Sequence, residues 1–228
     1  MKTTMTRVAG ALLAAGFLSA SPGVMAAPCV SGNTLATLLT NGGCTSGDKA
    51  YADFSWTGLP GTSQFNATFF TLGTEEIHNA QVIPDDGIPG NQTLPPLTVP
   101  GTYTLNYTLT ILNPLKWFSD VSIDSDVPAQ APEVLFTKIV DNDGVLGNGN
   151  LGTLTSDSGA PSGILDVNTT NKFTKLWIYE TVVIGAPGAI NSFTDTYTQD
   201  ISGIPEPGSL ALLGLGLAGL AAARRRRT

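Results

Sequence analysis

The chain has 228 residues, 42% of them hydrophobic, and a formal net charge of −7. This length suits a single domain that buries a proper core. The charge is uneven, because residues 27–203 hold 17 Asp and Glu but only five Lys, whereas the two ends hold the remaining basic residues. So acidic a segment excludes binding to nucleic acid or to an anionic membrane surface through bulk charge, and no nucleic-acid partner is expected.

The N-terminus has the pattern of a secretory signal peptide. Lys2 and Arg7 precede an apolar stretch over residues 8–20, and Val24-Met25-Ala26 supplies a small-residue cleavage site. The pattern predicts a signal peptide over residues 1–26 and an exported domain over residues 27–203. The alternative is an uncleaved membrane anchor.

Cys29 and Cys44 are the only cysteines, and both lie near the start of the expected mature chain. Export makes a disulfide permissible. A bridge would close a loop of about 15 residues and contribute roughly 3 kcal/mol in the chain-entropy model. Metal ligation is the alternative, but no His or second Cys pair lies near enough in sequence to complete a site.

The first predicted element is a short helix over residues 33–40. Asn33 can cap its N-terminus, and the Asn41-Gly42-Gly43 sequence can end it.

The rest of residues 27–203 has β-strand patterns. Many short strands separated by turn clusters predict an all-β fold, a β-sandwich of Ig-like or jelly-roll type with that one N-terminal helix. The predicted strands are 51–56, 64–72, 76–83, 102–112, 121–125, 133–141, 151–155, 163–167, 175–183 and 192–200.

The residue patterns of two of these strands predict how their side chains are buried. In residues 102–112, Tyr and Leu or Ile alternate with Thr and Asn, so one face should enter the core. In residues 192–200, Phe193, Asp195 and Tyr197 alternate with threonines, which predicts a two-sided strand or an edge strand.

The sequence Asp141-Asn142-Asp143-Gly144 contains the calcium candidates Asp141 and Asp143. A complete EF-hand loop is absent, because Gly152 stands where that loop requires glutamate. The alternatives are a looser calcium site or an ordinary turn in which Asp and Asn bond their own backbone. No other metal and no cofactor is expected.

No enzyme is predicted. His78 is the only histidine, and no activated nucleophile is marked near it, so it is predicted as a surface or cross-strand residue. Glu180 follows Trp177 and Tyr179, and an acid beside aromatic rings can face a sugar. Its alternative is one polar position on a half-buried strand.

Three tryptophans suggest carbohydrate binding as a second candidate function. Trp56, Trp117 and Trp177 could present a stacking platform to sugar rings, or they could belong to the core.

The C-terminus combines an apolar run with a basic end. Residues 209–223 contain only Leu, Ala, Gly and one Ser. As a helix, residues 208–223 would reach roughly 24 Å, against a hydrocarbon core of about 30 Å. The pattern predicts a single short transmembrane helix with cytoplasmic arginines. The alternative, a buried core helix, normally has a polar face that this run lacks.

The triplet Pro205, Glu206 and Pro207, the apolar run, and the cluster Arg224, Arg225, Arg226 and Arg227 together resemble the PEP-CTERM sorting signal. The resemblance covers residues 204–228. It implies an exported protein of a Gram-negative bacterium that makes exopolysaccharide, and an exosortase-type membrane protease as a partner that processes the chain near the triplet. The inner membrane would hold the protein before processing, and the cell surface or extracellular matrix would receive it.

These observations predict a non-enzymatic surface or biofilm-matrix protein that associates with extracellular polysaccharide. The alternative is a carbohydrate- or calcium-dependent ligand-binding module at the cell surface.

Overall fold

The computed structural model describes residues 26–72, 75–85, 96–167 and 171–201. The predicted transmembrane helix, the sorting residues and nearly all of the signal peptide lie outside these residues. One helix, α1 (Leu35–Asn41), precedes the strands. The strands are β1 (Cys44–Ser46), β2 (Lys49–Thr57), β3 (Gln64–Leu72), β4 (Glu75–Ile83), β5 (Gly101–Ile111), β6 (Lys116–Asp126), β7 (Pro132–Asp141), β8 (Asn150–Asp157), β9 (Ala160–Pro161), β10 (Ile164–Asp166), β11 (Lys175–Gly188) and β12 (Ser192–Ile201).

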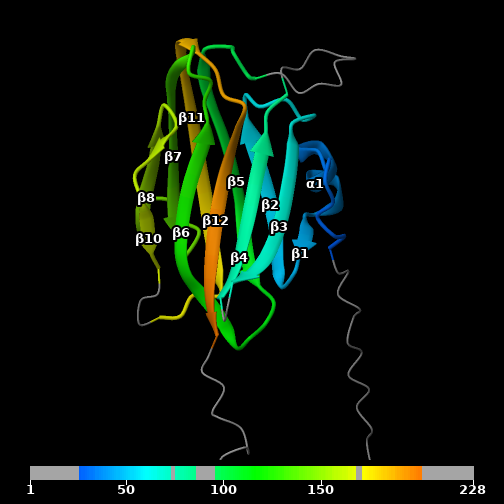
Figure 1. Cartoon of the computed structure of the whole chain (residues 1–228). Coiled ribbons are helices and arrows are strands. Elements are labelled where there is room, and N and C mark those ends of the chain that lie inside the picture. Colours follow the sequence, from blue (N-terminus) through cyan, green and yellow to red (C-terminus); the bar gives the residue numbers. More distant parts are fainter. Residues whose placement is uncertain (1–25, 73–74, 86–95, 168–170, 202–228) are drawn as a thin grey trace, which may run out of the picture.

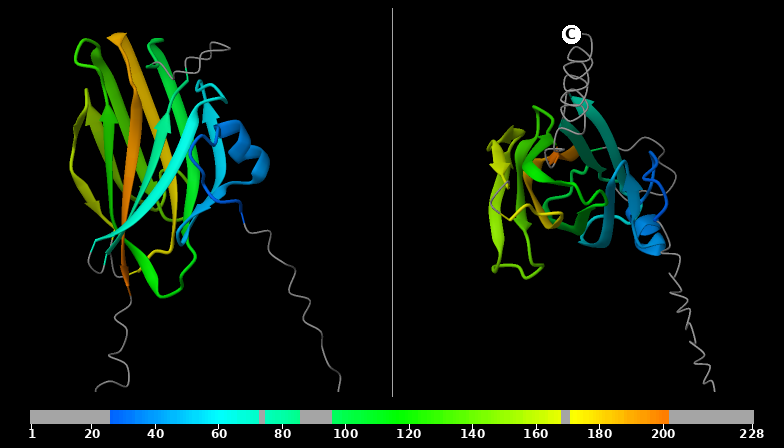
Figure 2. Two further views of the ribbon diagram at one scale, coloured as in Figure 1. Left: turned by 45° about the vertical axis from the view of Figure 1, so that its right-hand side comes forward. Right: turned by 90° about the horizontal axis from the view of Figure 1, so that it is seen from below.

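The strands form two antiparallel sheets packed face to face, which confirms the predicted β-sandwich (Figures 1 and 2). The seven-stranded sheet has the order β1-β2-β5-β11-β7-β8-β9, and the five-stranded sheet has the order β10-β6-β12-β4-β3. Helix α1 lies beside β2 at one side of the sandwich (Figure 1). Neighbours such as β5 and β11 are far apart in sequence, so pairing is largely non-local.

The core lies between the inner faces of the two sheets. The alternation predicted for residues 102–112 is confirmed, because Tyr103, Leu105, Tyr107, Leu109 and Ile111 are all buried. Such a strand buries every second side chain because successive side chains point to opposite faces of a sheet.

The N-cap of the helix lies one residue later in the sequence than predicted. Thr34, not Asn33, is the N-cap, and its side chain accepts the backbone N–H of Thr37 at 3.2 Å. Asn33 cannot be the N-cap, because its backbone carbonyl accepts the N–H of Phe65. The carbonyl of Thr34 instead accepts the first hydrogen bond within the helix, from the N–H of Leu38. The predicted end is confirmed, since Gly42 has a φ of 72° and its N–H reaches back to Leu38 and Leu39.

The prediction of an edge position for residues 192–200 was wrong. Strand β12 lies between β6 and β4, in the middle of the five-stranded sheet. Its inward side chains Phe193, Asp195 and Tyr197 are buried, whereas the threonines between them are half-buried. The inward side chain of Asp195 meets Lys138 and Tyr107 of the facing seven-stranded sheet, which the pattern of a single strand could not indicate.

Candidate functional site

A β-bulge in β2 shapes the outer face of the seven-stranded sheet. Ala52 pairs with Thr108 and Ser55 with Asn106, so β2 has one more residue than β5 between these pairs. The extra residue turns Phe54 into the core and leaves both Asp53 and Ser55 pointing outward. Asp53 has a φ of 55°, a conformation that Asp tolerates better than most residues. Bulges often stand beside binding sites because they redirect side chains.

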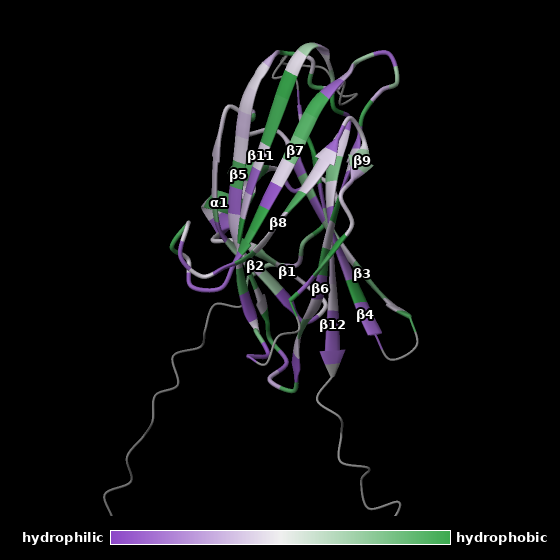
Figure 3. Ribbon diagram, turned by 90° about the vertical axis from the view of Figure 1, so that its left-hand side faces the viewer, coloured by the Kyte–Doolittle hydropathy of each residue, from purple (hydrophilic) through white to green (hydrophobic). Residues whose placement is uncertain are grey.

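The bulge borders an open depression of about 270 Å³. Its floor is a two-by-two array, because Trp177 pairs with Thr108 and Tyr179 pairs with Asn106 across β11 and β5. Figure 3 views the molecule from the side on which β5, β11, β7 and β8 lie. The array combines two aromatic side chains with the polar Asn106 and Thr108, and the acidic Asp53 stands at its rim. We call this site the outer-face depression.

Hydrogen bonds hold the polar side of the outer-face depression. Thr108 Oγ1 donates to Asp53 Oδ2 at 2.9 Å, and Asn106 Nδ2 donates to Ser55 Oγ at 3.3 Å. The Lys175 ammonium lies 4.5 Å from the centroid of the Trp177 ring and 3.9 Å from Asp53 Oδ2. The Asp53 side chain stays 68% exposed, so its carboxylate can accept a hydrogen bond from a ligand.

Of the three tryptophans, none is fully buried or fully exposed. Trp177 belongs to the outer-face depression, whereas Trp56 packs partly against the core. Trp117 lies on β6 in the other sheet, under the ammonium of Lys172 at 4.0 Å. The structure therefore brings together Trp177 and Tyr179 but does not place the three tryptophans on one platform.

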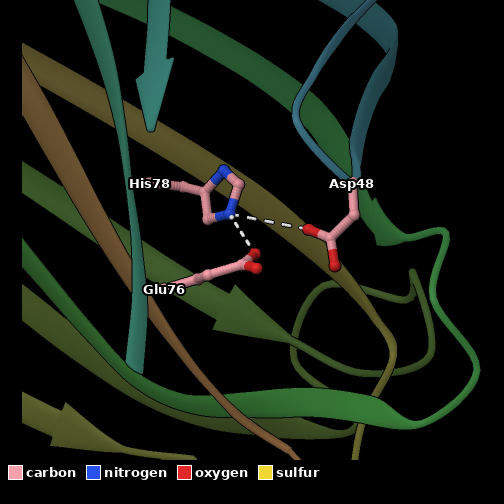
Figure 4. A group of neighbouring side chains, drawn as sticks. All are labelled: Asp48, Glu76 and His78. Carbon is pink, nitrogen blue, oxygen red and sulfur yellow. Dashed lines mark ion pairs between the residues drawn. The ribbon is translucent and has the colours of Figure 1, made fainter. Parts of the chain in front are cut away.

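Among the described residues, a second site joins Asp48, Glu76 and His78 at one end of the sandwich (Figure 4). His78 Nε2 lies 3.5 Å from both Asp48 Oδ1 and Glu76 Oε2, and potential metal-donor atoms of the three residues lie within 4.8 Å of one another. Two ammonium groups already neutralise these carboxylates. Lys116 Nζ lies 3.2 Å from Asp48 and 2.5 Å from Glu76, and Lys49 Nζ lies 2.7 Å from Asp48. A metal ion would have to displace them.

His78 is completely buried, so the prediction of a surface position was wrong, although its cross-strand placement is correct. Phe69, its partner on β3, stacks on its ring at 5.6 Å between centroids. Burial and then the charge of Lys49 lower the pKa of His78 to about 4, against the opposing pull of the two carboxylates. The imidazole is therefore neutral at neutral pH. Burial likewise lowers the pKa of Lys49 to about 8.

Glu180 is fully buried and does not line the outer-face depression. It shares the core with Asp195 and with Lys138, and sequence reasoning did not single out Lys138. The sequence did contain a signal for Lys138. Lys138 falls on the inward positions of a strand that also buries Val134, Phe136 and Val140. A charge at an apolar position of an alternating strand indicates a buried polar site.

The calcium candidates Asp141 and Asp143 accept hydrogen bonds from backbone N–H groups of a turn. Asp141 Oδ1 accepts the backbone N–H groups of Asp143 and Gly144 at 2.8 and 2.7 Å. Asp143 Oδ1 accepts the N–H of Val145, and its Oδ2 accepts the side-chain amide of Asn148. This arrangement matches the turn alternative, and calcium binding stays a prediction.

The predicted disulfide between Cys29 and Cys44 is present. It ties the segment before α1 to β1, whose Thr45 also forms backbone hydrogen bonds with Ala27 and Cys29.

Residues 203–227 match the family of the PEP-CTERM protein-sorting motif. The chain carries this sorting motif. Such a motif indicates export, anchoring at the membrane through the C-terminus and processing by an exosortase. Among the described residues, no helix is long and apolar enough to cross a membrane.

No curated protein matches the chain. Two solved structures, both mutants of a family 29 carbohydrate-binding module studied for ligand recognition, are 15% identical to it. The matches cover 67% and 66% of this chain and 94% and 93% of those chains, with TM-scores of 0.26 and 0.25. Scores this low do not establish a common arrangement of strands.

Proposed function

We propose that the domain before the sorting motif is a non-enzymatic surface or matrix protein that associates with extracellular polysaccharide through the outer-face depression. The observation that carries the proposal is the array of Trp177 and Tyr179 beside Asn106, Thr108 and Asp53. Aromatic faces pack against the C–H faces of sugar rings, and a few convergent polar groups then fix the hydroxyls.

The charge of the domain indicates which class of polysaccharide it should bind. With 17 acidic residues and five lysines over residues 27–203, the domain repels polyanions at low salt. Lys175 is the only lysine whose contacts place it at the depression among the described residues, and Asp53 partly neutralises it. A neutral polysaccharide is therefore the preferred ligand class over an acidic one.

The absence of catalysis is part of the proposal. The core carboxyls of Glu180 and Asp195 are about 1% exposed, so a sugar cannot reach them. Asp48 and Glu76 are paired with lysines, which leaves neither as a free general base.

Affinity electrophoresis of the exported protein through gels that contain a polymer tests the proposal. The probes are a neutral glucan, a galactomannan, alginate as an acidic contrast, and the exopolysaccharide extracted from the producing bacterium, each with calcium and with a chelator. We expect retardation by a neutral polymer, and at least about a tenfold loss of affinity in Trp177→Ala.

The matched control is Trp117→Ala, because Trp117 is also half-buried under a lysine but belongs to the other sheet. It should bind like the wild type. The assignment of the site would be overturned if Trp177→Ala and Trp117→Ala weakened the retardation equally. It would also be overturned if no probe retarded the protein. Retardation only with calcium would instead favour the calcium-dependent module.

A further inference from the structure

Three ionisable side chains meet in the core between the two sheets. Lys138 on β7 and Glu180 on β11 are register partners in the seven-stranded sheet, and Asp195 faces them from β12 in the other sheet. Lys138 is 0% exposed, and the two acids are each 1% exposed. Burying an ion costs several kcal/mol even after the protein relaxes. Three such groups at one place therefore require an explanation beyond packing.

The contacts place an amine directly against a carboxyl group. Lys138 Nζ forms an ion pair with Asp195 Oδ1 and lies 3.8 Å from Glu180 Oε1. The hydroxyl of Tyr107 donates to Asp195 Oδ2 at 2.5 Å and lies 3.3 Å from Glu180 Oε1. Lys138 Nζ also donates to the Tyr197 hydroxyl at 3.1 Å. Glu180 thus stands next to both members of the ion pair.

The surroundings are buried and aromatic. Lys138 Nζ lies 4.6 Å from the centroid of the Tyr197 ring, and the rings of Phe136 and Phe193 pack 4.9 Å apart, centroid to centroid, in the same core. Burial, and then the negative charge of Asp195, raise the pKa of Glu180 well above its ordinary value, which favours the protonated, uncharged form of this side chain. Its Oε2 has no hydrogen-bond partner among the described residues.

We propose that Lys138 and Asp195 condense to form an isopeptide bond between the two sheets, with Glu180 as the proton carrier. Within the ion pair, a proton passes from Nζ to the Asp195 carboxylate, which leaves a neutral amine beside a neutral acid. The Nζ lone pair then adds to Asp195 Cγ and forms the new C–N bond.

Collapse of the tetrahedral centre completes the reaction. Glu180 gives its proton to the departing hydroxyl and takes one from Nζ, so it ends as it began. The Cγ–O bond breaks and one water leaves. No oxidant, reductant or other reactant is needed, because an amine and a carboxylic acid give an amide and water.

The core favours this condensation for three reasons. The fold holds the two reacting groups together, which replaces a bimolecular encounter by an effectively unimolecular one. Exclusion of water removes the solvent that would drive hydrolysis. The amide is neutral, so its formation ends the cost of keeping two opposite charges out of water. The product joins β7 to β12 covalently.

Peptide mapping of the full chain tests the bond. The exported protein is reduced, alkylated, denatured and digested with trypsin, which does not cleave after an acylated lysine. We expect the peptide that contains Lys138, uncleaved at that residue, joined to the peptide that contains Asp195, with a total mass one water below their sum. Tandem mass spectrometry should locate the branch at these two residues. Cleavage after Lys138 and a free Asp195 peptide in protein shown to be folded would overturn the proposal.

Variants test the parts of the mechanism. Lys138→Arg should abolish the branched peptide, and Glu180→Gln, which keeps the size of the side chain, should reduce its yield strongly in protein that still folds. Lys49→Arg is the matched control, because Lys49 is equally buried but belongs to the cluster with Asp48. It should retain the branched peptide. A full yield in Glu180→Gln would refute the proton-carrier role, and a branch at Lys49 would refute the choice of residues.

Discussion

Glu180 on β11 and Lys138 on β7 are register partners whose side chains both enter the core, with Oε1 and Nζ 3.8 Å apart. The facing Asp195 completes a polar centre inside an otherwise apolar sandwich. While Lys138 and Asp195 form the uncondensed ion pair, opposite charges share this centre, so the loss of one partner should cost more than the loss of two.

The first prediction concerns that asymmetry. Lys138→Met leaves two buried carboxyl groups without a cation, and we expect it to lower the free energy of unfolding by at least about 3–5 kcal/mol. The double variant Lys138→Met with Asp195→Leu removes the unpaired charge as well, and should recover part of this loss. Guanidinium unfolding followed by fluorescence measures both.

The control for this prediction is Lys175→Met, which removes an exposed ion pair worth about 0–1 kcal/mol. Equal effects of Lys138→Met and Lys175→Met would contradict the buried ionic centre.

The second prediction concerns acid stability. The pKa of His78 is about 4 in the folded domain and about 6.5 in the unfolded chain. The unfolded state therefore binds more protons between these values, so stability falls as pH is lowered from about 6.5 to 4. Thermal unfolding of wild type should show this fall, and His78→Gln should show less of it. Parallel curves for the two proteins would contradict a buried neutral histidine.

The third prediction concerns the disulfide. Replacing both Cys29 and Cys44 by serine opens a loop with a sequence separation of 15, which should cost roughly 3 kcal/mol in the chain-entropy model. Urea unfolding of the variant and of reduced wild type should give the same loss. An unchanged midpoint would show that the N-terminal segment contributes nothing to the cooperative unit.

The fourth prediction concerns the support of Trp177. Gly144 has a φ of 79°, and a Cβ there would lie 2.7 Å from Trp177 Nε1. Gly144→Ala should therefore displace the indole, change its fluorescence and weaken polysaccharide binding. Gly147→Ala is the matched control, because Gly147 has a φ of 94° but no heavy atom within 4 Å of its Cβ position. If both variants bind alike, backbone strain and not indole contact explains the effect.

The fifth prediction concerns sorting. Replacing Pro205, Glu206 and Pro207 by alanine should keep the full-length chain in the inner membrane of the native host, while wild type leaves it without its arginine tail. Fractionation followed by intact-mass analysis reads out both events. If both proteins keep the tail and stay in the inner membrane, the motif does not direct processing in this chain.

The sequence alone was sufficient where the physics is local. Alternating residues in 102–112 identified a strand and its buried face, and Gly42 identified the end of the helix, since both depend on neighbours in the chain. The sorting motif at 203–227 was readable for the same reason, because its three parts are contiguous.

The tertiary structure decided the rest. The bulge at Asp53 depends on how β2 pairs with β5, and the outer-face depression needs Trp177 from a strand far along the chain. Likewise, Lys138, Glu180 and Asp195 occupy inward positions beside buried apolar or aromatic residues in three separate strands, and only the facing of two sheets brings them together. A sequence pattern can show that a side chain turns inward, but the energy of a buried charge depends on which partner it meets there.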